Sequence, residues 1–194
     1  MLLRRLYDWT MDLAGHRHAV AALALVAFVE SSVFPVPPDV LLIPMVLAVR
    51  ERAFVMALLC TSASVLGGIL GYGIGFFLFE TVGQWIVDLY GFAHAYDGFR
   101  ENFEEWGWWI VIGGGVTPFP YKIITIMSGV AKLDPSVFVF ASVLARGLRF
   151  FLVAGLLWFF GEPIRNFIEK HLGNLALLFF ILLAGGFILA TAIL

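Results

Sequence analysis

The sequence contains little charge for its length. Asp, Glu, Lys and Arg make up only 13% of the 194 residues, whereas hydrophobic residues make up 61%. Soluble globular domains carry about 25% charged residues, and the mean hydropathy here is +0.96. The composition therefore predicts a membrane protein. With 12 Lys and Arg against 14 Asp and Glu, the net charge is −2, so the chain lacks the basic excess of a nucleic-acid-binding protein.

Cysteine and histidine are also scarce. The single cysteine, Cys60, cannot form an internal disulfide, and a thiolate metal site needs several such ligands. The four histidines have no spacing that would hold a metal ion, so no metal and no cofactor is expected. We expect no enzyme either, because the chain has no GxSxG motif and no histidine in its apolar spans to activate Ser128.

Two apolar stretches do not fit plain membrane crossings, the first because of its length and the second because it is interrupted. Residues 19–49 would form a helix about 46 Å long, against roughly 30 Å of hydrocarbon and the ~40 residues that two spans need. Residues 106–131 are similarly interrupted. Prolines break both stretches near the middle, because proline removes a backbone donor and clashes with the preceding turn. The expected turn residues are Pro35, Pro37, Pro38, Pro118 and Pro120. We therefore predict two re-entrant hairpins, each made of two half-membrane helices.

The two predicted hairpins are related by a repeat. Pro118 and Pro120 follow Pro35 and Pro37 at a constant offset of 83 residues, and the same offset aligns Asp39 with Lys122. Each hairpin precedes a long apolar segment. The predicted fold is therefore all-α and integral to the membrane. Its segments are an interfacial amphipathic helix at 1–18, a membrane domain at 19–160 (hairpin 19–49, span 53–79, acidic extracytoplasmic segment 80–105, hairpin 106–131, span 135–160), and a C-terminal transmembrane helix at 174–194.

Basic residues indicate the orientation of the first hairpin. They flank it at Arg4, Arg5, Arg17, Arg50 and Arg52, whereas the segment 80–105 carries six acids and only one arginine. The positive-inside rule places the base of this hairpin and the N-terminus in the cytoplasm. Since 53–79 would cross once, the second hairpin is expected to enter from the opposite side. Inverted, broken repeats of this kind are typical of transporters with a site near the bilayer midplane.

Five ionisable residues lie in the apolar part of this domain: Glu30, Asp39, Lys122, Arg146 and Arg149. An isolated charge at the bilayer centre costs about 2.5–3.5 kcal/mol, so these side chains are expected to face the protein interior. Two interpretations remain open. The acids and bases either lock the fold as a structural ionic core, or form a site whose surplus positive charge binds a phosphate-bearing headgroup, to which arginine can donate bidentately.

A glycine stripe lies in the first long span. Gly67, Gly71 and Gly75 are spaced four residues apart, which lets another helix approach closely. We predict that this face packs against a helix, and that one of the hairpins supplies it.

Three runs, taken in order, resemble the DedA superfamily, also called the SNARE-associated or VTT domain proteins, and within it the YqaA-like branch. The runs are FVESS with FPVPPD at 28–39, GG with GYG and a further glycine at 67–75, and TPFPYK with SGV at 117–130. The resemblance covers roughly 19–160. It implies a bacterial inner-membrane protein with opposed re-entrant hairpins, involved in membrane homeostasis and in moving phospholipids or polyprenyl phosphates between leaflets. It also implies that Glu30 and Asp39 are the family's essential acids and that Lys122 is the base after the second proline motif.

The predicted function is that of a multi-pass lipid transporter, a flippase or scramblase. The expected partners are membrane lipids with anionic phosphate headgroups; coupling to protons and a homo-oligomeric assembly are left open. The alternatives are an assembly protein with a purely structural ionic core and, less favoured, an intramembrane enzyme that uses Glu30 and Asp39.

Overall fold

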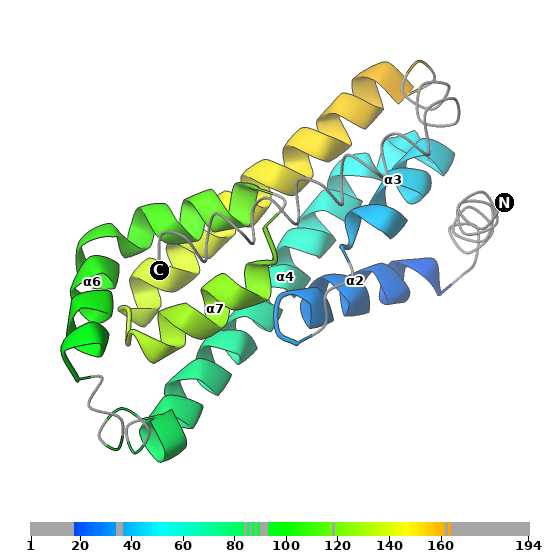
Figure 1. The fold of residues 1–194 in the computed structure, drawn as a ribbon. Coiled ribbons are helices and arrows are strands. Elements are labelled where there is room, and N and C mark those ends of the chain that lie inside the picture. The colour runs from blue at the N-terminus through cyan, green and yellow to red at the C-terminus, as the bar shows by residue number, and fades with distance from the viewer. Residues whose placement is uncertain are drawn as a thin grey trace, which may run out of the picture.

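The computed structural model describes residues 18–33, 37–83, 85, 87, 89, 93–117, 119–161 and 163 (Figure 1). The C-terminal transmembrane helix predicted at 174–194 lies outside these residues. The interfacial helix predicted at 1–18 also lies outside them, apart from His18. Of the five predicted turn prolines, Pro35 and Pro118 are outside the described part.

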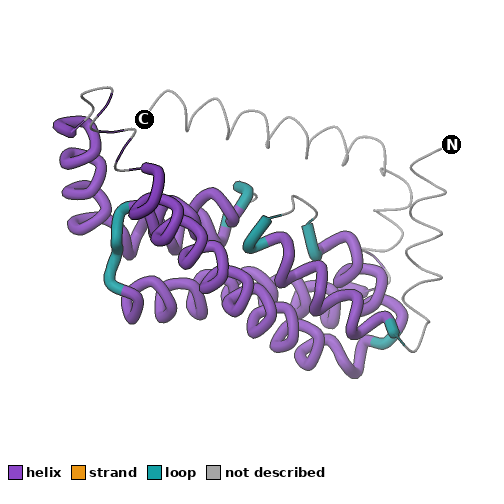
Figure 2. Tube along the Cα trace, turned by 90° about the horizontal axis from the view of Figure 1, so that it is seen from below, coloured by secondary structure: helices purple, strands orange, loops and turns teal. Residues whose placement is uncertain are grey.

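Every regular element in the described part of the chain is a helix, so the all-α prediction is confirmed there (Figure 2). In chain order they are α2 (Ala19–Glu30), α3 (Asp39–Ala48), the 3-10 turn η1 (Arg50–Arg52), α4 (Ala53–Leu78), the π turn η2 (Phe79–Gly83), α6 (Ala93–Val116), α7 (Tyr121–Val130) and a last helix, Pro135–Gly161. We call this last element the second long helix.

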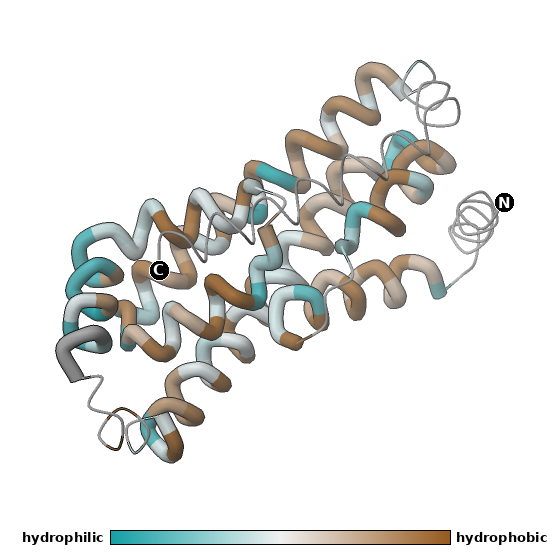
Figure 3. The backbone as a smooth tube through the Cα atoms, in the orientation of Figure 1, coloured by the Kyte–Doolittle hydropathy of each residue, from teal (hydrophilic) through white to brown (hydrophobic). Residues whose placement is uncertain are grey.

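Two helical stretches, Arg50–Gly83 and Pro135–Gly161, are long and apolar enough to cross a membrane. The 26 residues of α4 span about 39 Å at 1.5 Å per residue, which exceeds the roughly 30 Å of a hydrocarbon core. Both helices expose large apolar side chains along their length, among them Val55, Phe77, Phe140 and Phe159, and Figure 3 shows brown segments along both. Such extensive exposed apolar surface suits contact with lipid rather than water.

The two long helices lie side by side and run in opposite directions (Figure 1). Phe54, at the start of α4, stacks on Phe151 near the end of the second long helix, with ring centroids 6.3 Å apart. Tyr72, near the end of α4, lies 5.1 Å from Phe138, near the start of the second long helix. The pairing of early with late residues requires an antiparallel arrangement.

Each long helix is preceded by a pair of shorter helices. The offset of 83 residues between the prolines also relates the helix bounds: it moves α4 (53–78) onto 136–161 and α3 (39–48) onto 122–131, each within one residue of the observed helix. Together with the antiparallel long helices, these matching bounds support two units of the same design placed in opposite orientations. We call 19–83 the first unit and 93–161 the second unit.

The tips of the two helix pairs meet near the middle of the long helices. The Lys122 ammonium donates to the Val33 carbonyl at 3.2 Å. The Thr125 hydroxyl lies 3.0 Å from the Ser31 carbonyl. Residues far apart in sequence are thereby brought together at the point where each helix pair turns.

The glycine face of α4 lets both helix pairs approach closely. A Cβ at Gly67 would stand 2.8 Å from the carbonyl carbon of Phe28 in α2, and one at Gly75 would stand 2.9 Å from that of Ile126 in α7. A Cβ at Gly71 would stand 3.0 Å from the Ser31 carbonyl oxygen. The three glycines thus lie against backbone from both helix pairs.

The helix α6 begins earlier than the apolar pattern suggests. The sequence places the start of the second hairpin at 106, whereas α6 begins at Ala93. Figure 3 shows teal segments in its first half, which includes an exposed Arg100–Glu104 ion pair at 3.0 Å, one helical turn apart. Counting apolar residues misses a solvated helical turn that is supported by such i,i+4 pairs.

Asp134 caps the start of the second long helix. The hydroxyl of Ser136 and the backbone N–H groups of Ser136 and Val137 donate to its carboxylate, and its own carbonyl accepts the N–H of Phe138 at 2.9 Å. This is the hydrogen-bond pattern of an N-cap residue. The Ser136 hydroxyl, followed by the two backbone N–H groups, holds the pKa of Asp134 below its ordinary value.

Acidification is expected to destabilise the protein through this cap. A carboxyl group whose pKa is lower in the folded than in the unfolded chain contributes stability above its unfolded pKa of about 3.9, and this contribution is lost as the pH falls through the folded pKa. Thermal unfolding in detergent should therefore show a steeper fall in Tm below about pH 4 for the native chain than for Asp134→Asn, which keeps a capping oxygen but does not titrate. Parallel Tm profiles for the two proteins would contradict the role of this carboxylate.

Candidate functional site

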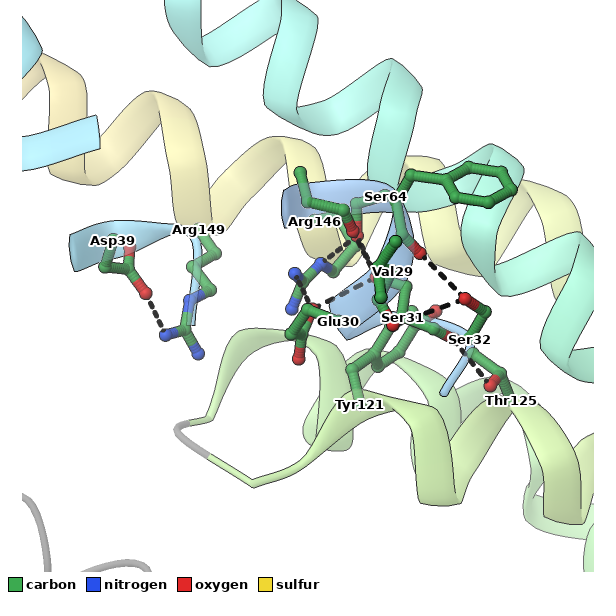
Figure 4. Close-up of polar contacts among 12 residues, drawn as sticks. Val29, Glu30, Ser31, Ser32, Asp39, Ser64, Tyr121, Thr125, Arg146 and Arg149 are labelled. Atoms are coloured by element: carbon green, nitrogen blue, oxygen red, sulfur yellow. Dashed lines mark hydrogen bonds and ion pairs between the residues drawn. The ribbon is translucent and has the colours of Figure 1, made fainter. Parts of the chain in front are cut away.

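Two ion pairs, one buried and one partly buried, lie where the tips of the helix pairs meet the second long helix (Figure 4). In the first pair, Arg146 Nη2 lies 2.7 Å from Glu30 Oε2, and the two side chains are 2% and 10% exposed. Glu30 ends α2, and Arg146 lies near the middle of the second long helix. The pair therefore joins the first unit to the second unit.

Two serine hydroxyls complete a closed ring with this pair. Arg146 Nε donates to Ser64 Oγ at 2.6 Å, Ser64 Oγ lies 2.6 Å from Ser31 Oγ, and Ser31 Oγ lies 3.1 Å from Glu30 Oε2. Each hydroxyl has one proton to donate. If Ser64 donates to Ser31, and Ser31 donates to Glu30, both protons are used and the ring closes. We call these four residues the clasp.

Aromatic rings cover the Arg146 guanidinium. Its central carbon lies 4.8 Å from the ring centroid of Tyr121 and 4.7 Å from that of Phe150. Tyr121 is itself fixed, because its hydroxyl forms a 2.6 Å hydrogen bond with Ser142 Oγ. Stacking of this kind suits arginine, whose flat guanidinium is weakly hydrated.

The second ion pair is more open. Arg149 Nη2 lies 2.6 Å from Asp39 Oδ2, and the side chains are 15% and 18% exposed. Arg149 Nη1 also donates to the Thr117 carbonyl, at the end of α6, at 2.6 Å. The other carboxylate oxygen, Asp39 Oδ1, is buried and has no hydrogen-bond donor within the described residues.

Lys122 lies apart from both pairs. Its ammonium is on the exposed side of the tip, where it donates to the Val33 carbonyl. Among the described residues, no carboxylate lies within ion-pair distance of it. Of the three predicted basic site residues, Lys122 is therefore the one without a neighbouring acid in the described part of the chain.

The structure thus brings four of the five predicted site residues into two pairs, Glu30 with Arg146 and Asp39 with Arg149. The alignment of Asp39 with Lys122 in the repeat does not correspond to a contact between them. Sequence reasoning missed Ser31, Ser64 and Tyr121. Ser64 carries a usable signal, because it lies three and seven residues before Gly67 and Gly71 on the close-packed face of α4.

These residues offer ionic and hydrogen-bonding chemistry. In the described part of the chain, no group of three or more His, Cys, Asp or Glu side chains is placed to hold a metal ion. The guanidinium groups can bind an anion, and the carboxylates can bind a cation or a proton.

Comparison with known proteins identifies the family. The VTT domain family model matches residues 36–159, which includes α3, α4, α6, α7 and most of the second long helix. An uncharacterized protein of Haemophilus influenzae is 39% identical over 167 residues, which is 86% of each chain. An uncharacterized HI0703 homolog of Histophilus somni is 38% identical over 151 residues, which is 78% of each chain. No solved structure matches.

The resemblance drawn from the proline and glycine motifs is confirmed at the level of the superfamily, whereas assignment to the YqaA-like branch stays a prediction. The family match agrees with two helices long and apolar enough to span a bilayer and with the lipid-compatible surface of the bundle. The chain therefore belongs to the VTT domain family of DedA-type membrane proteins.

Proposed function

We propose that the protein moves a phosphate-bearing lipid, such as a phospholipid or a polyprenyl phosphate, between the leaflets of the bacterial inner membrane. The two helix pairs act as re-entrant hairpins that enter from opposite sides, and the long helices span the bilayer. Because each hairpin tip lies near the middle of the long helices, the two ion pairs lie near the bilayer midplane. Arg50 and Arg52 then lie on the cytoplasmic side, as the positive-inside rule requires.

The observation that carries the proposal is the presence of two ion pairs near the middle of the two long helices, whose outward faces expose large apolar side chains. Removing two charges from water costs several kcal/mol per ion, and a buried pair is often no more stabilising than well-packed apolar residues of similar volume. Ionisable groups at membrane depth are therefore functional candidates by default. Arginine suits recognition of a phosphate group, and Arg149 is the more exposed of the two arginines.

A structural ionic core is the second candidate, and one observation favours it. The clasp pairs the charge of Glu30 with Arg146 and gives both serine hydroxyls a partner, and the Ala27 carbonyl is a further acceptor for Ser31 at 3.1 Å. A pair of that kind can hold two units together without touching a ligand. In the Asp39–Arg149 pair, by contrast, one carboxylate oxygen has no hydrogen-bond donor among the described residues. The transport proposal therefore depends mainly on this pair.

Reconstitution into vesicles tests the proposal. Purified protein should accelerate the transfer of fluorescently labelled phosphatidylglycerol between leaflets. The transfer is measured by chemical quenching of the label in the outer leaflet. Arg149→Gln should lower the transfer rate at least about tenfold, because it removes a guanidinium from the site, a loss equivalent to about 1.4 kcal/mol. Arg100→Gln is the matched control, since Arg100 lies in an exposed pair far from the tips.

The vesicle assay also separates the alternatives. A structural core predicts no acceleration of transfer above protein-free vesicles. An intramembrane enzyme predicts a chemically altered lipid, which chromatography of the extracted lipid would detect. Equal transfer by the native chain and by Arg149→Gln would show that this pair has no part in transport.

A further inference from the structure

The two ion pairs differ in how fully their charged groups are satisfied. Glu30 Oε2 accepts from Arg146 and is within reach of the Ser31 hydroxyl, and Arg146 also donates to Ser64 and is covered by two rings. Asp39, by contrast, uses only Oδ2 toward Arg149, while the buried Oδ1 has no donor among the described residues. A buried polar atom without a partner loses the hydrogen bonds that it would make with water. The Asp39 carboxylate is therefore a poor match for its own position.

The surroundings of Asp39 favour an anion with more oxygens. Asp39 is the first residue of α3, a helix of ten residues, so the carboxylate lies at the positive end of the helix dipole. The backbone N–H groups of Val40, Leu41 and Leu42 already donate to the carbonyls of Pro37 and Pro38. A phosphate here would therefore be bound by the Arg149 guanidinium, a group that binds phosphate well. Arg149 turns one terminal nitrogen toward Asp39 and the other toward the Thr117 carbonyl, so the carboxylate does not use the two-pronged geometry that arginine offers.

The two pairs also differ in access. The Asp39 and Arg149 side chains are 18% and 15% exposed, whereas the Arg146 side chain is 2% exposed. Figure 4 shows Arg149 and Asp39 set apart from the residues around Glu30. A ligand can therefore reach Arg149 without opening the clasp, and a displaced Asp39 carboxylate can be hydrated.

We propose that Arg149 binds the phosphate of the cargo and that the Asp39 carboxylate occupies the place of that phosphate when no cargo is bound. The clasp stays closed and holds the end of α2 against the second long helix. This assignment rests on the proposed transport of a phosphate-bearing lipid, and it names the group within the site that contacts the headgroup. Cargo binding exchanges one anion for another at Arg149. The Arg149 guanidinium is therefore paired with an anion both before and after the cargo binds.

Removing the competing charge should strengthen binding. Native mass spectrometry of the full chain, titrated with phosphatidylglycerol in detergent, should show about tenfold tighter binding for Asp39→Asn than for the native chain, or about 1.4 kcal/mol. Arg149→Gln should bind about tenfold more weakly. Glu30→Gln should not tighten binding, because the clasp does not compete with the phosphate. Diacylglycerol with the same acyl chains, which lacks the phosphate, should bind the native chain and Asp39→Asn alike.

Several results would overturn this assignment. One is a folded Asp39→Asn protein that binds phosphatidylglycerol no more tightly than the native chain, and another is equal tightening by Glu30→Gln. Should Asp39→Asn not fold, Arg149→Gln decides, since unchanged phosphatidylglycerol binding in that variant would also overturn it. Inorganic phosphate serves as a competitor: competition at millimolar concentration identifies the phosphate group itself as sufficient, whereas binding of the lipid alone identifies a lipid-borne phosphate as the source.

The proposed anion exchange at Arg149 and the proposed lipid transport can be refuted independently of each other. The expected affinity changes without lipid transfer in vesicles would refute the proposed transport and leave the anion exchange at Arg149 standing. Lipid transfer without these affinity changes would refute the anion exchange at Arg149 and leave the proposed transport standing. The Asp39→Asn variant is expected to combine tighter binding with slower transfer, because release of the cargo needs the returning carboxylate.

Discussion

Replacing Arg146 with methionine is expected to lower the free energy of unfolding by about 3–5 kcal/mol, which is the usual cost of removing one partner from a buried ion pair. Methionine fills a similar volume between Tyr121 and Phe150 but donates no hydrogen bond. The Glu30 carboxylate is then left buried, and Ser64 loses its donor. Equilibrium unfolding of the purified protein in detergent would measure this loss.

A second substitution distinguishes charge from packing. The double variant Glu30→Gln with Arg146→Met should recover most of the lost stability, because no uncompensated charge remains, and the coupling between the two sites gives the interaction energy. Arg100→Gln is the control for a solvated pair and should cost less than about 1 kcal/mol. If Arg146→Met cost no more than Arg100→Gln, the Glu30–Arg146 pair would be as solvated as a surface pair.

Adding a single methyl group at Gly67 is expected to produce the next largest loss, about 1–3 kcal/mol, which is typical of overpacking. The new Cβ would meet the backbone carbonyl of Phe28, which cannot rotate away as a side chain could. α2 would have to move off α4, and Glu30 at its end would move with it. Both the unfolding free energy and the rate of lipid transfer in vesicles should fall.

Gly73→Ala is a matched control on the same helix. Apart from its chain neighbours and the backbone of its own helix, no atom of the described residues lies within 4 Å of a Cβ at Gly73, so the methyl group meets no packing partner. Alanine favours a helix over glycine by about 1 kcal/mol, and the control should therefore be neutral or stabilising. Equal losses at the two glycines would mean that α2 and α4 do not pack as closely as the structure shows.

Much of the architecture can be predicted from the positions of the prolines and from the lengths of the apolar segments. The prolines of the first stretch separate α2 from α3, and the long apolar segments predicted at 53–79 and 135–160 correspond to helices ending within one residue of those bounds. Length and proline chemistry are local properties, so a single sequence carries them. The polar first half of α6 was not predicted, since it is amphipathic and short of apolar residues.

The partners inside the site could not be predicted in the same way. Sequence identifies Glu30, Asp39 and the two arginines as costly in a membrane, but the choice of partner depends on how the two units fit together. Arg146 meets Glu30 and Arg149 meets Asp39 because the second long helix runs antiparallel to α4 and turns both arginines toward the first unit. Of the clasp serines, Ser64 shares the glycine face of α4, but its partner could not be predicted, since lone hydroxyls are common on close-packed membrane helices.

Both ion pairs connect the first unit to the second, and this has a consequence for the resting molecule. Separating the two units at the tips would leave four charged side chains unpaired in a medium that solvates them poorly. The free-energy cost of spontaneous opening therefore rises as the environment of these side chains becomes more apolar. A charged guest that replaces one anion removes part of that penalty. In the proposed transporter, the same groups that bind the guest would thereby suppress leakage of ions and lipids through an idle molecule.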